Sequence, residues 1–149
     1  MKYELNVKID RPREAVVAIF LDPEKLRDWQ PEVTRRDHVA GPLPVGLGTQ
    51  YSQSVKMGRR EMEMTDTVSI FDPPGHFAAV YEAAGVWNQV ENWFEEEGSR
   101  THWRLTSEFQ CKGMMMRLMI RFFPGMFRKQ TQQFMDRFKA FAEAQIPVG

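Results

Sequence analysis

The segment from Gly113 to Gln145 constrains the fold of this chain more than any other part of the sequence. It is rich in Met and Phe, and its apolar residues recur with the period of a helix. An unbroken helix of that length would be about 50 Å long, which exceeds the width of a small domain. We therefore expect a break at Pro124-Gly125. Beyond the break, one face of the helix is predicted to carry an apolar stripe made of Phe127, Phe134, Phe138 and Phe141. We expect a sheet to cover this stripe.

The composition indicates one domain of balanced charge. The 149 residues include 20 basic and 20 acidic side chains, and the sequence pI is near 6.8. A chain of this length forms one hydrophobic core, so we expect a single domain over residues 1–149. Without a net positive field, nucleic acid is not an expected partner.

The cysteine content and the first residues bear on the compartment. Cys111 is the only cysteine and cannot form an intramolecular disulfide, and Met1 is followed by charged residues rather than by an apolar signal segment. Both features predict a cytoplasmic protein. No run approaches the roughly 18 apolar residues that would cross a bilayer, so no transmembrane segment is expected. The predicted oligomeric state is a monomer or a homodimer.

The rest of the chain alternates apolar and polar residues with the period of strands. Residues 3–9 form the first such run, and two short helices are predicted after it, over 12–20 and 23–29. An extended segment covers 33–39, and further strands separated by short turns are predicted over 49–57, 60–71, 76–84, 86–96 and 100–111. Short turns make neighbouring strands antiparallel. The predicted fold is α+β, with a curved antiparallel sheet of about seven strands against a long C-terminal helix.

Four local patterns follow one another along the chain. They are Val7-x-Ile9-x-Arg11-Pro12-x-Glu14-x-Val16, Asp22-Pro23-Glu24-Lys25-Leu26 with Trp29 and Pro31, Gly46-x-Gly48-Thr49-x-Tyr51, and Ser99-Arg100-Thr101 leading through Trp103 and Leu105 to Gly113. In this order they resemble the START/Bet v 1-like (SRPBCC) superfamily, in particular its polyketide cyclase/dehydrase-like branch. The resemblance covers essentially the whole chain. It implies a helix-grip fold, in which the sheet wraps around the C-terminal helix and an apolar cavity lies between them.

Members of that superfamily share a fold but differ in function, so the function has to be argued from the site. Extending the alternation of each strand shows which side chains face the core, and scattered polar groups in an apolar wall are typical of a small-molecule pocket. The predicted ligand-binding residues are Tyr51, Gln53, Met64, Asp66, Tyr81, Asn88, Asn92, Trp103, Ser107, Met119, Phe123 and Phe127.

Asp66 is the most informative of these residues, because it shares a strand face with Met64, Val68 and Ile70. A buried carboxylate without a partner is costly, so it gains a donor or its pKa rises. One interpretation is a cavity carboxylate that anchors a ligand or acts as a general acid/base. The other is a bulge near Thr65 that turns the side chain to solvent, toward Arg59 or Arg60. The sequence is compatible with both. No other catalytic residue is assigned.

Other candidate chemistries have less support. Cys111 is expected to be a small apolar residue, and His38, His76 and His102 fall on different elements without a companion at metal-ligand spacing. We expect no metal and no cofactor. Asn88 and Asn92 have an alternative role in bonding to the sheet backbone. The loop over 41–48 is predicted to form a cavity rim rather than a phosphate cradle, because a strand follows it.

The half of the C-terminal segment before the break, from Met114 to Phe123, is apolar nearly all round and is interrupted by Arg117 and Arg121. Three interpretations stay open. It is a deformable cover of the cavity, since Met suits irregular contacts. It is ordinary core. Or it is a peripheral contact with a membrane or a protein partner, with the arginines at headgroup level.

The favoured function is binding or transport of a hydrophobic small molecule, such as a lipid, an isoprenoid or a polyketide-like compound, in the internal cavity. The first alternative is a polyketide cyclase/aromatase-type enzyme that uses Asp66 as general acid/base. The second is an interaction module that docks through the Met-rich helix. A non-catalytic role is favoured over an enzyme.

Overall fold

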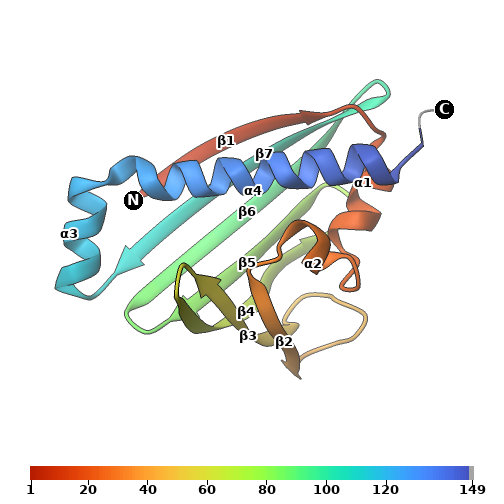
Figure 1. The fold of residues 1–149 in the computed structure, drawn as a ribbon. Coiled ribbons are helices and arrows are strands. Elements are labelled where there is room, and N and C mark those ends of the chain that lie inside the picture. The colour runs from red at the N-terminus through yellow and green to blue at the C-terminus, as the bar shows by residue number, and fades with distance from the viewer. Residues whose placement is uncertain (148–149) are drawn as a thin grey trace.

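One antiparallel sheet, curved around the longest helix, forms the framework of the protein (Figure 1). The computed structural model describes residues 1–147. The elements are β1 (Lys2–Ile9), α1 (Arg13–Phe20), α2 (Leu26–Trp29), β2 (Val33–Ala40), β3 (Gln50–Met57), β4 (Arg60–Asp72), β5 (His76–Ala83), β6 (Val86–Glu97), β7 (Arg100–Cys111), α3 (Met114–Phe122) and α4 (Pro124–Gln145). The seven strands are ordered β1-β7-β6-β5-β4-β3-β2. This is the predicted helix-grip fold.

The order of the sheet follows from the turns and from one long-range pairing. Tight turns join β3 through β7 in sequence, and Gly58 and Gly98 occupy positive φ angles of 63° at two of these turns. β1 then pairs with β7 in continuous register from Lys2 opposite Glu108 to Ile9 opposite Thr101. Every second residue of β1 is buried, as the alternation predicted. The N-terminal strand is thereby held beside the last strand of the sheet.

The predicted break in the C-terminal segment is confirmed. α3 ends at Phe122, Phe123 leaves the helical conformation with φ −132° and ψ 58°, and α4 begins at Pro124. Proline suits the first position of a helix because the missing N–H has no helical partner there. The residues of α4 that are buried are Phe127, Met135, Phe138 and Ala142.

Aromatic side chains join α4 to the sheet. Phe138 is 0% exposed, and its ring centroid lies 4.7 Å from that of Trp29, 5.2 Å from that of Trp103 and 5.7 Å from that of Phe20. The Nε1 of Trp103 donates a hydrogen bond to Oδ1 of Asn92 at 3.0 Å, which satisfies the only polar atom of the buried indole. The core therefore occupies one end of the space beneath α4.

Two local predictions differ from the structure. The second helix is shorter than 23–29, because the chain first turns at Asp22, whose Oδ1 accepts a hydrogen bond from the Glu24 N–H at 3.0 Å. In β4, the register with β5 shifts between Val68 and Ile70. This bulge reverses the alternation, so that Phe71 lines the interior instead of Ile70.

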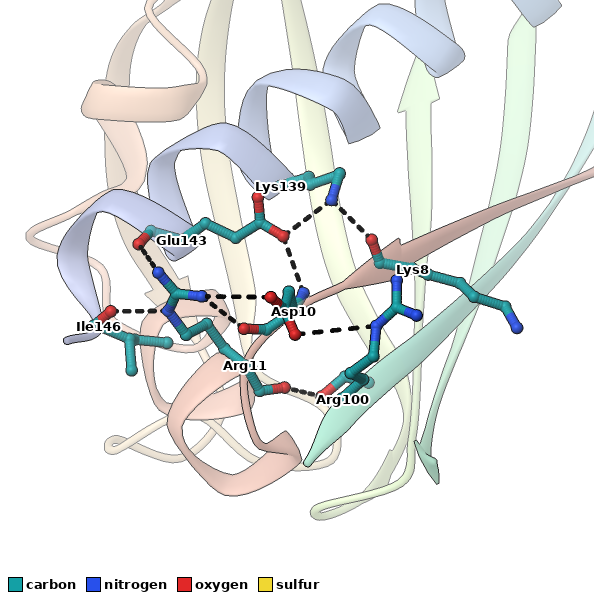
Figure 2. A network of polar contacts seen from close by, with 8 residues as sticks. Lys8, Asp10, Arg11, Arg100, Lys139, Glu143 and Ile146 are labelled. Atoms are coloured by element: carbon teal, nitrogen blue, oxygen red, sulfur yellow. Dashed lines mark hydrogen bonds and ion pairs between the residues drawn. The ribbon is translucent and has the colours of Figure 1, made fainter. Parts of the chain in front are cut away.

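The C-terminal end of α4 is tied to the end of β1 by a polar network (Figure 2). Arg11 donates from Nε to the Ile146 carbonyl and from Nη2 to the Glu143 carbonyl, both at 2.7 Å. These carbonyls lack partners within the helix, so the guanidinium acts as a C-terminal cap. The Glu143 carboxylate in turn accepts from the Asp10 N–H and from Lys139, each at 2.8 Å. Among residues 1–147, no helix is both long and apolar enough to span a membrane.

Replacing this cap is expected to destabilise the protein. In the variant Arg11→Met, two partly buried carbonyls lose a charged donor, and the free energy of unfolding should fall by about 2 kcal/mol. Urea denaturation measures the change. Arg27→Met is the matched control, because Arg27 donates to the Thr34 carbonyl from an exposed position, and its effect should stay within about 0.5 kcal/mol. Equal losses in both variants would contradict the capping role.

Candidate functional site: an internal cavity

A cavity of about 520 Å³ lies beneath the concave face of the sheet. Its wall contains residues of β2 to β7, of α2 and α4, and of the loop between β2 and β3. From that loop come Leu43, Pro44 and Val45, as predicted for a cavity rim. α3 contributes Met116. The volume is in the range of about 300 to 1,000 Å³ that small-molecule sites occupy.

Most of the predicted ligand-binding residues line this cavity. They are Tyr51, Gln53, Met64, Asp66, Tyr81, Asn88, Asn92, Ser107 and Phe127. The other three lie elsewhere. Trp103 is fully buried in the aromatic core, while Met119 and Phe123 are exposed to solvent. Alternation identifies the inner face of a strand, but it does not separate the part of that face under the cavity from the part under the core.

Asp66 faces the cavity. Its side chain is directed by the register of three strands, in which it lies opposite Tyr51 on β3 and opposite Tyr81 on β5. Residues paired across strands point to the same face of a sheet. The pairing of β3 with β4 is continuous from Gln50 to Met57, so no bulge occurs at Thr65. Asp66 is 6% exposed. The alternative in which it turns to solvent is therefore wrong.

The partner of Asp66 is Arg36 of β2, rather than Arg59 or Arg60. Nη2 of Arg36 lies 3.3 Å from Oδ2 of Asp66, and the guanidinium carbon lies 3.6 Å from the centre of the Tyr51 ring. A cation over an aromatic ring is attracted by the negative face of the ring. Arg36, Tyr51, Asp66 and Tyr81 are called the polar cluster below.

Sequence reasoning missed Arg36, and the cause is a bulge. Strict alternation from the buried Val33 would direct Arg36 outward. The register between β2 and β3 shifts between Val33 and Arg35, which brings Arg36 opposite Gln53 and onto the inner face. A signal was nevertheless present, because the buried carboxylate of Asp66, two strands away on β4, requires a cation or another donor.

Burial and charge within the polar cluster shift the pKa values of Asp66 and Tyr81. Burial raises the pKa of the Asp66 carboxyl, and Arg36 opposes this rise through its charge and its hydrogen bond. The negative charge of Asp66, followed by burial, raises the pKa of the Tyr81 phenol well above its ordinary value. Tyr81 therefore keeps its proton at neutral pH and can donate a hydrogen bond. The cluster offers a ligand donors from Tyr81 and Arg36 and an acceptor from Asp66.

The two asparagines that line the cavity form some of their side-chain hydrogen bonds within the sheet. Nδ2 of Asn88 donates to Oγ of Ser107 at 2.9 Å and to the carbonyl of Glu108 at 3.0 Å. The predicted bonding of Asn88 to the sheet backbone is confirmed by the second contact. Asn92 instead accepts from the indole of Trp103. Asn88 lies opposite Tyr81, so its hydrogen bonds stiffen the wall beside the polar cluster, whereas Asn92 stiffens the wall next to the aromatic core.

The histidines lie outside the cavity wall. Nε2 of His76 is 2.9 Å from a carboxylate oxygen of Glu91, and Nε2 of His102 is 2.8 Å from Oδ1 of Asn6. In the part of the chain that the structure describes, no three His, Cys, Asp or Glu side chains are grouped in a way that could hold a metal ion.

Residues 1–143 match the family model described as polyketide cyclase/dehydrase and lipid transport. The chain belongs to this family. The START/Bet v 1-like resemblance of the sequence is thereby confirmed, together with the branch that the four motifs indicated. The search among curated proteins found no match.

Solved structures share the fold at low sequence identity. A protein from Thermus thermophilus has a TM-score of 0.80 and 15% identity, with 99% of this chain and 100% of that chain covered. The Zhui aromatase/cyclase from a Streptomyces species has a TM-score of 0.81 and 14% identity, with 99% and 96% covered. A START superfamily protein from Mycobacterium smegmatis has a TM-score of 0.75 and 12% identity, with 97% and 99% covered. At these identities the comparisons establish the fold and leave the ligand open.

Proposed function

We propose that the protein binds a hydrophobic small molecule in the internal cavity and carries it without chemical change. The observation that supports this most directly is a mostly apolar cavity of about 520 Å³ in which a buried carboxylate, Asp66, is paired with Arg36. A wall of this kind binds the apolar body of a ligand through burial, and a few polar groups orient it. Lipids, isoprenoids and polyketide-like ring compounds fit this description.

The polar cluster suggests what one end of the ligand carries. Tyr81 is a neutral donor, Arg36 is a charged donor, and Asp66 accepts. A carbonyl or hydroxyl oxygen could accept from these donors, whereas a pure hydrocarbon would leave the buried Nε of Arg36 without a hydrogen-bond partner. The ligand is therefore proposed to be an oxygen-bearing compound, with its oxygen toward β3, β4 and β5. The cytoplasmic location and a monomeric or homodimeric state stay predictions.

Binding can be tested with a neutral fluorescent ketone, prodan. The variant Ala79→Phe places a ring in the cavity wall, next in alternation to Phe77 and Tyr81. It should weaken prodan binding by about tenfold or more, because the added ring occupies cavity volume that the probe needs. Fluorescence titration gives the Kd. The control is Ala140→Phe, which adds the same ring at an exposed position of α4.

An unchanged Kd in both variants would count against ligand binding in the cavity, provided that circular dichroism shows both to be folded. Mass spectrometry of an organic extract of the purified protein supplies an independent measurement. An apolar compound that is present with the wild type and depleted with Ala79→Phe is the expected result.

A second candidate function is a cyclase-type enzyme, and the raised pKa of the Asp66 carboxyl beside Arg36 favours it. A carboxyl with a raised pKa in a cavity can remove and return a proton, and a guanidinium can stabilise a developing enolate. Incubation with a linear poly-β-ketone, followed by mass spectrometry, would detect ring closure with loss of water. A catalytic role predicts that Asp66→Asn abolishes this product and leaves prodan binding intact.

A further inference from the structure

α3 carries an apolar face that no part of the described chain covers. Met114 and Met115 are each 79% exposed, and Phe122 is 67% exposed. Leu118 is exposed as well. Exposing a contiguous group of large apolar side chains on one short helix is unfavourable in water, so such a face indicates a contact surface. Figure 1 shows α3 at the end of α4 that lies away from the C-terminus, projecting beyond the strands.

The helix has three distinct sides. Met116 and Ile120, four residues apart, turn toward the protein and pack against its core. Met114, Leu118 and Phe122 follow one another at four-residue spacing on an outer side and form the exposed stripe, which is called the outer stripe below. Arg117 and Arg121, also four residues apart, run along its border and are exposed. A stripe of apolar residues bordered by arginines is the arrangement of a helix that lies in a membrane interface.

The charge around α3 has one sign. No Asp or Glu occurs from residue 109 to residue 135, although the whole chain holds 20 of them. The same stretch contains five cations, namely Lys112, Arg117, Arg121, Arg128 and Lys129. The structure pairs none of these five with a carboxylate within residues 1–147. A neutral protein thus has a local excess of positive charge at its most apolar exposed surface, which is complementary to an anionic surface with an apolar interior.

We propose that α3 docks on the surface of an anionic phospholipid bilayer, with the outer stripe in the acyl-chain boundary and Arg117 and Arg121 at the phosphates. A bilayer provides both an anionic surface and an apolar interior, and an interfacial helix buries its apolar face about 5 to 10 Å into the boundary between headgroups and acyl chains. Methionine side chains adapt to such a fluid partner. Met116 belongs to the same helix and lines the cavity. Docking therefore brings the cavity wall to the membrane, whatever molecule the cavity holds.

The test is co-sedimentation of the full chain with vesicles of equal parts phosphatidylcholine and phosphatidylglycerol, compared with vesicles of phosphatidylcholine alone. Binding is expected for the anionic vesicles. The variant Arg117→Gln/Arg121→Gln should weaken it by about 25-fold, or about fivefold for each arginine at the surface. Raising NaCl from about 0.1 M to about 1 M shortens the screening length from about 10 Å to about 3 Å and should remove the same contribution. The variant Met114→Ser/Phe122→Ser should weaken binding by about tenfold or more at both salt concentrations.

Two control variants make the same kinds of substitution at exposed positions outside α3. Arg59→Gln/Arg60→Gln removes two exposed cations where the turn after β3 enters β4, and Val39→Ser/Leu47→Ser removes two exposed apolar side chains that do not line the cavity. Both should bind the anionic vesicles like the wild type.

Absence of vesicle binding, or an equal loss in the controls, would overturn the proposal. A wild type that is dimeric by light scattering, becomes monomeric in Met114→Ser/Phe122→Ser and ignores vesicles would assign the outer stripe to a second copy of this chain instead. Prodan binding is measured on the same samples, so failure of docking and failure of cavity binding are distinguishable.

Discussion

Replacing Arg36 by methionine should lower the free energy of unfolding by about 3 kcal/mol at neutral pH, because it leaves the Asp66 carboxylate buried without its cation. Asp66 is 6% exposed, and its contact with Arg36 at 3.3 Å is the only ion pair that the described chain gives it. Methionine keeps the apolar length of the side chain over the Tyr51 ring. The variant therefore removes charge and hydrogen bonding with little loss of packed volume.

This loss should depend on pH in a defined direction. Burial already raises the pKa of Asp66 in the folded protein, and Arg36 limits the rise. Without Arg36 the folded pKa moves further above the value in the unfolded chain, which is about 3.9. A raised carboxyl pKa means that the folded state binds more protons, so stability falls as pH rises through the interval between the two values. The difference between Arg36→Met and wild type should thus be small near about pH 4 and grow as the pH rises toward neutral. Urea denaturation over this range measures it.

Two further variants isolate the ion pair. Asp66→Asn in the Arg36→Met background removes the buried charge and should recover most of the stability at neutral pH. Arg35→Met is the control, because the neighbouring Arg35 forms its ion pairs with Asp37 and Glu63 at the surface, where such pairs contribute little. A loss in Arg36→Met that does not change with pH would show that packing rather than charge accounts for the destabilisation.

Replacing Phe138 by alanine should lower the free energy of unfolding by about 3 to 5 kcal/mol, because it removes a fully buried ring and leaves a void. This ring contacts aromatic side chains from three separate elements, namely Phe20 of α1, Trp29 at the end of α2 and Trp103 of β7. Its loss therefore weakens the attachment of α4 to the sheet and to both short helices at once. Urea denaturation monitored by tryptophan fluorescence measures the change.

Phe122→Ala is the matched control for this truncation. Phe122 belongs to the same C-terminal segment but is 67% exposed, so the same chemical change should alter stability by no more than about 0.5 kcal/mol. A large loss in Phe122→Ala would mean that α3 is covered in solution, which would also bear on the docking surface. Similar small losses in both variants would contradict the position of Phe138 at the centre of the core.

Much of the fold could be predicted because local pattern and tertiary environment agree. In β1 and β7, each apolar residue of an alternating run meets the core, and the strand bounds follow the turn residues closely. The direction of Tyr51, Gln53 and Tyr81 follows from the same period, since the pairing of β3 with β4 and of β5 with β6 is continuous around these residues. Where the ladder is regular, a residue's position along the strand decides which face it occupies.

The rest of the site could not be predicted, because a single inserted residue reverses that rule. Bulges in β2 and β4 direct Arg36 and Phe71 inward and Ile70 away from the cavity. Nothing in the local sequence of β2 distinguishes Arg36 from Arg35, which pairs with acids at the surface. The difference depends on the register with β3, which is a property of two strands rather than of one.

The C-terminal segment shows the same difference between what local sequence determines and what tertiary contacts decide. The sequence by itself determined that the helix breaks at Pro124 and that its second half presents a stripe of phenylalanines, because proline geometry and helical period act within a few residues. It also determined that residues 109–135 are basic and apolar. Only the tertiary structure decided that Phe138 is enclosed by three aromatic rings while Phe122 faces solvent. Periodicity states which side chains share a face, and burial of that face depends on which distant element reaches it.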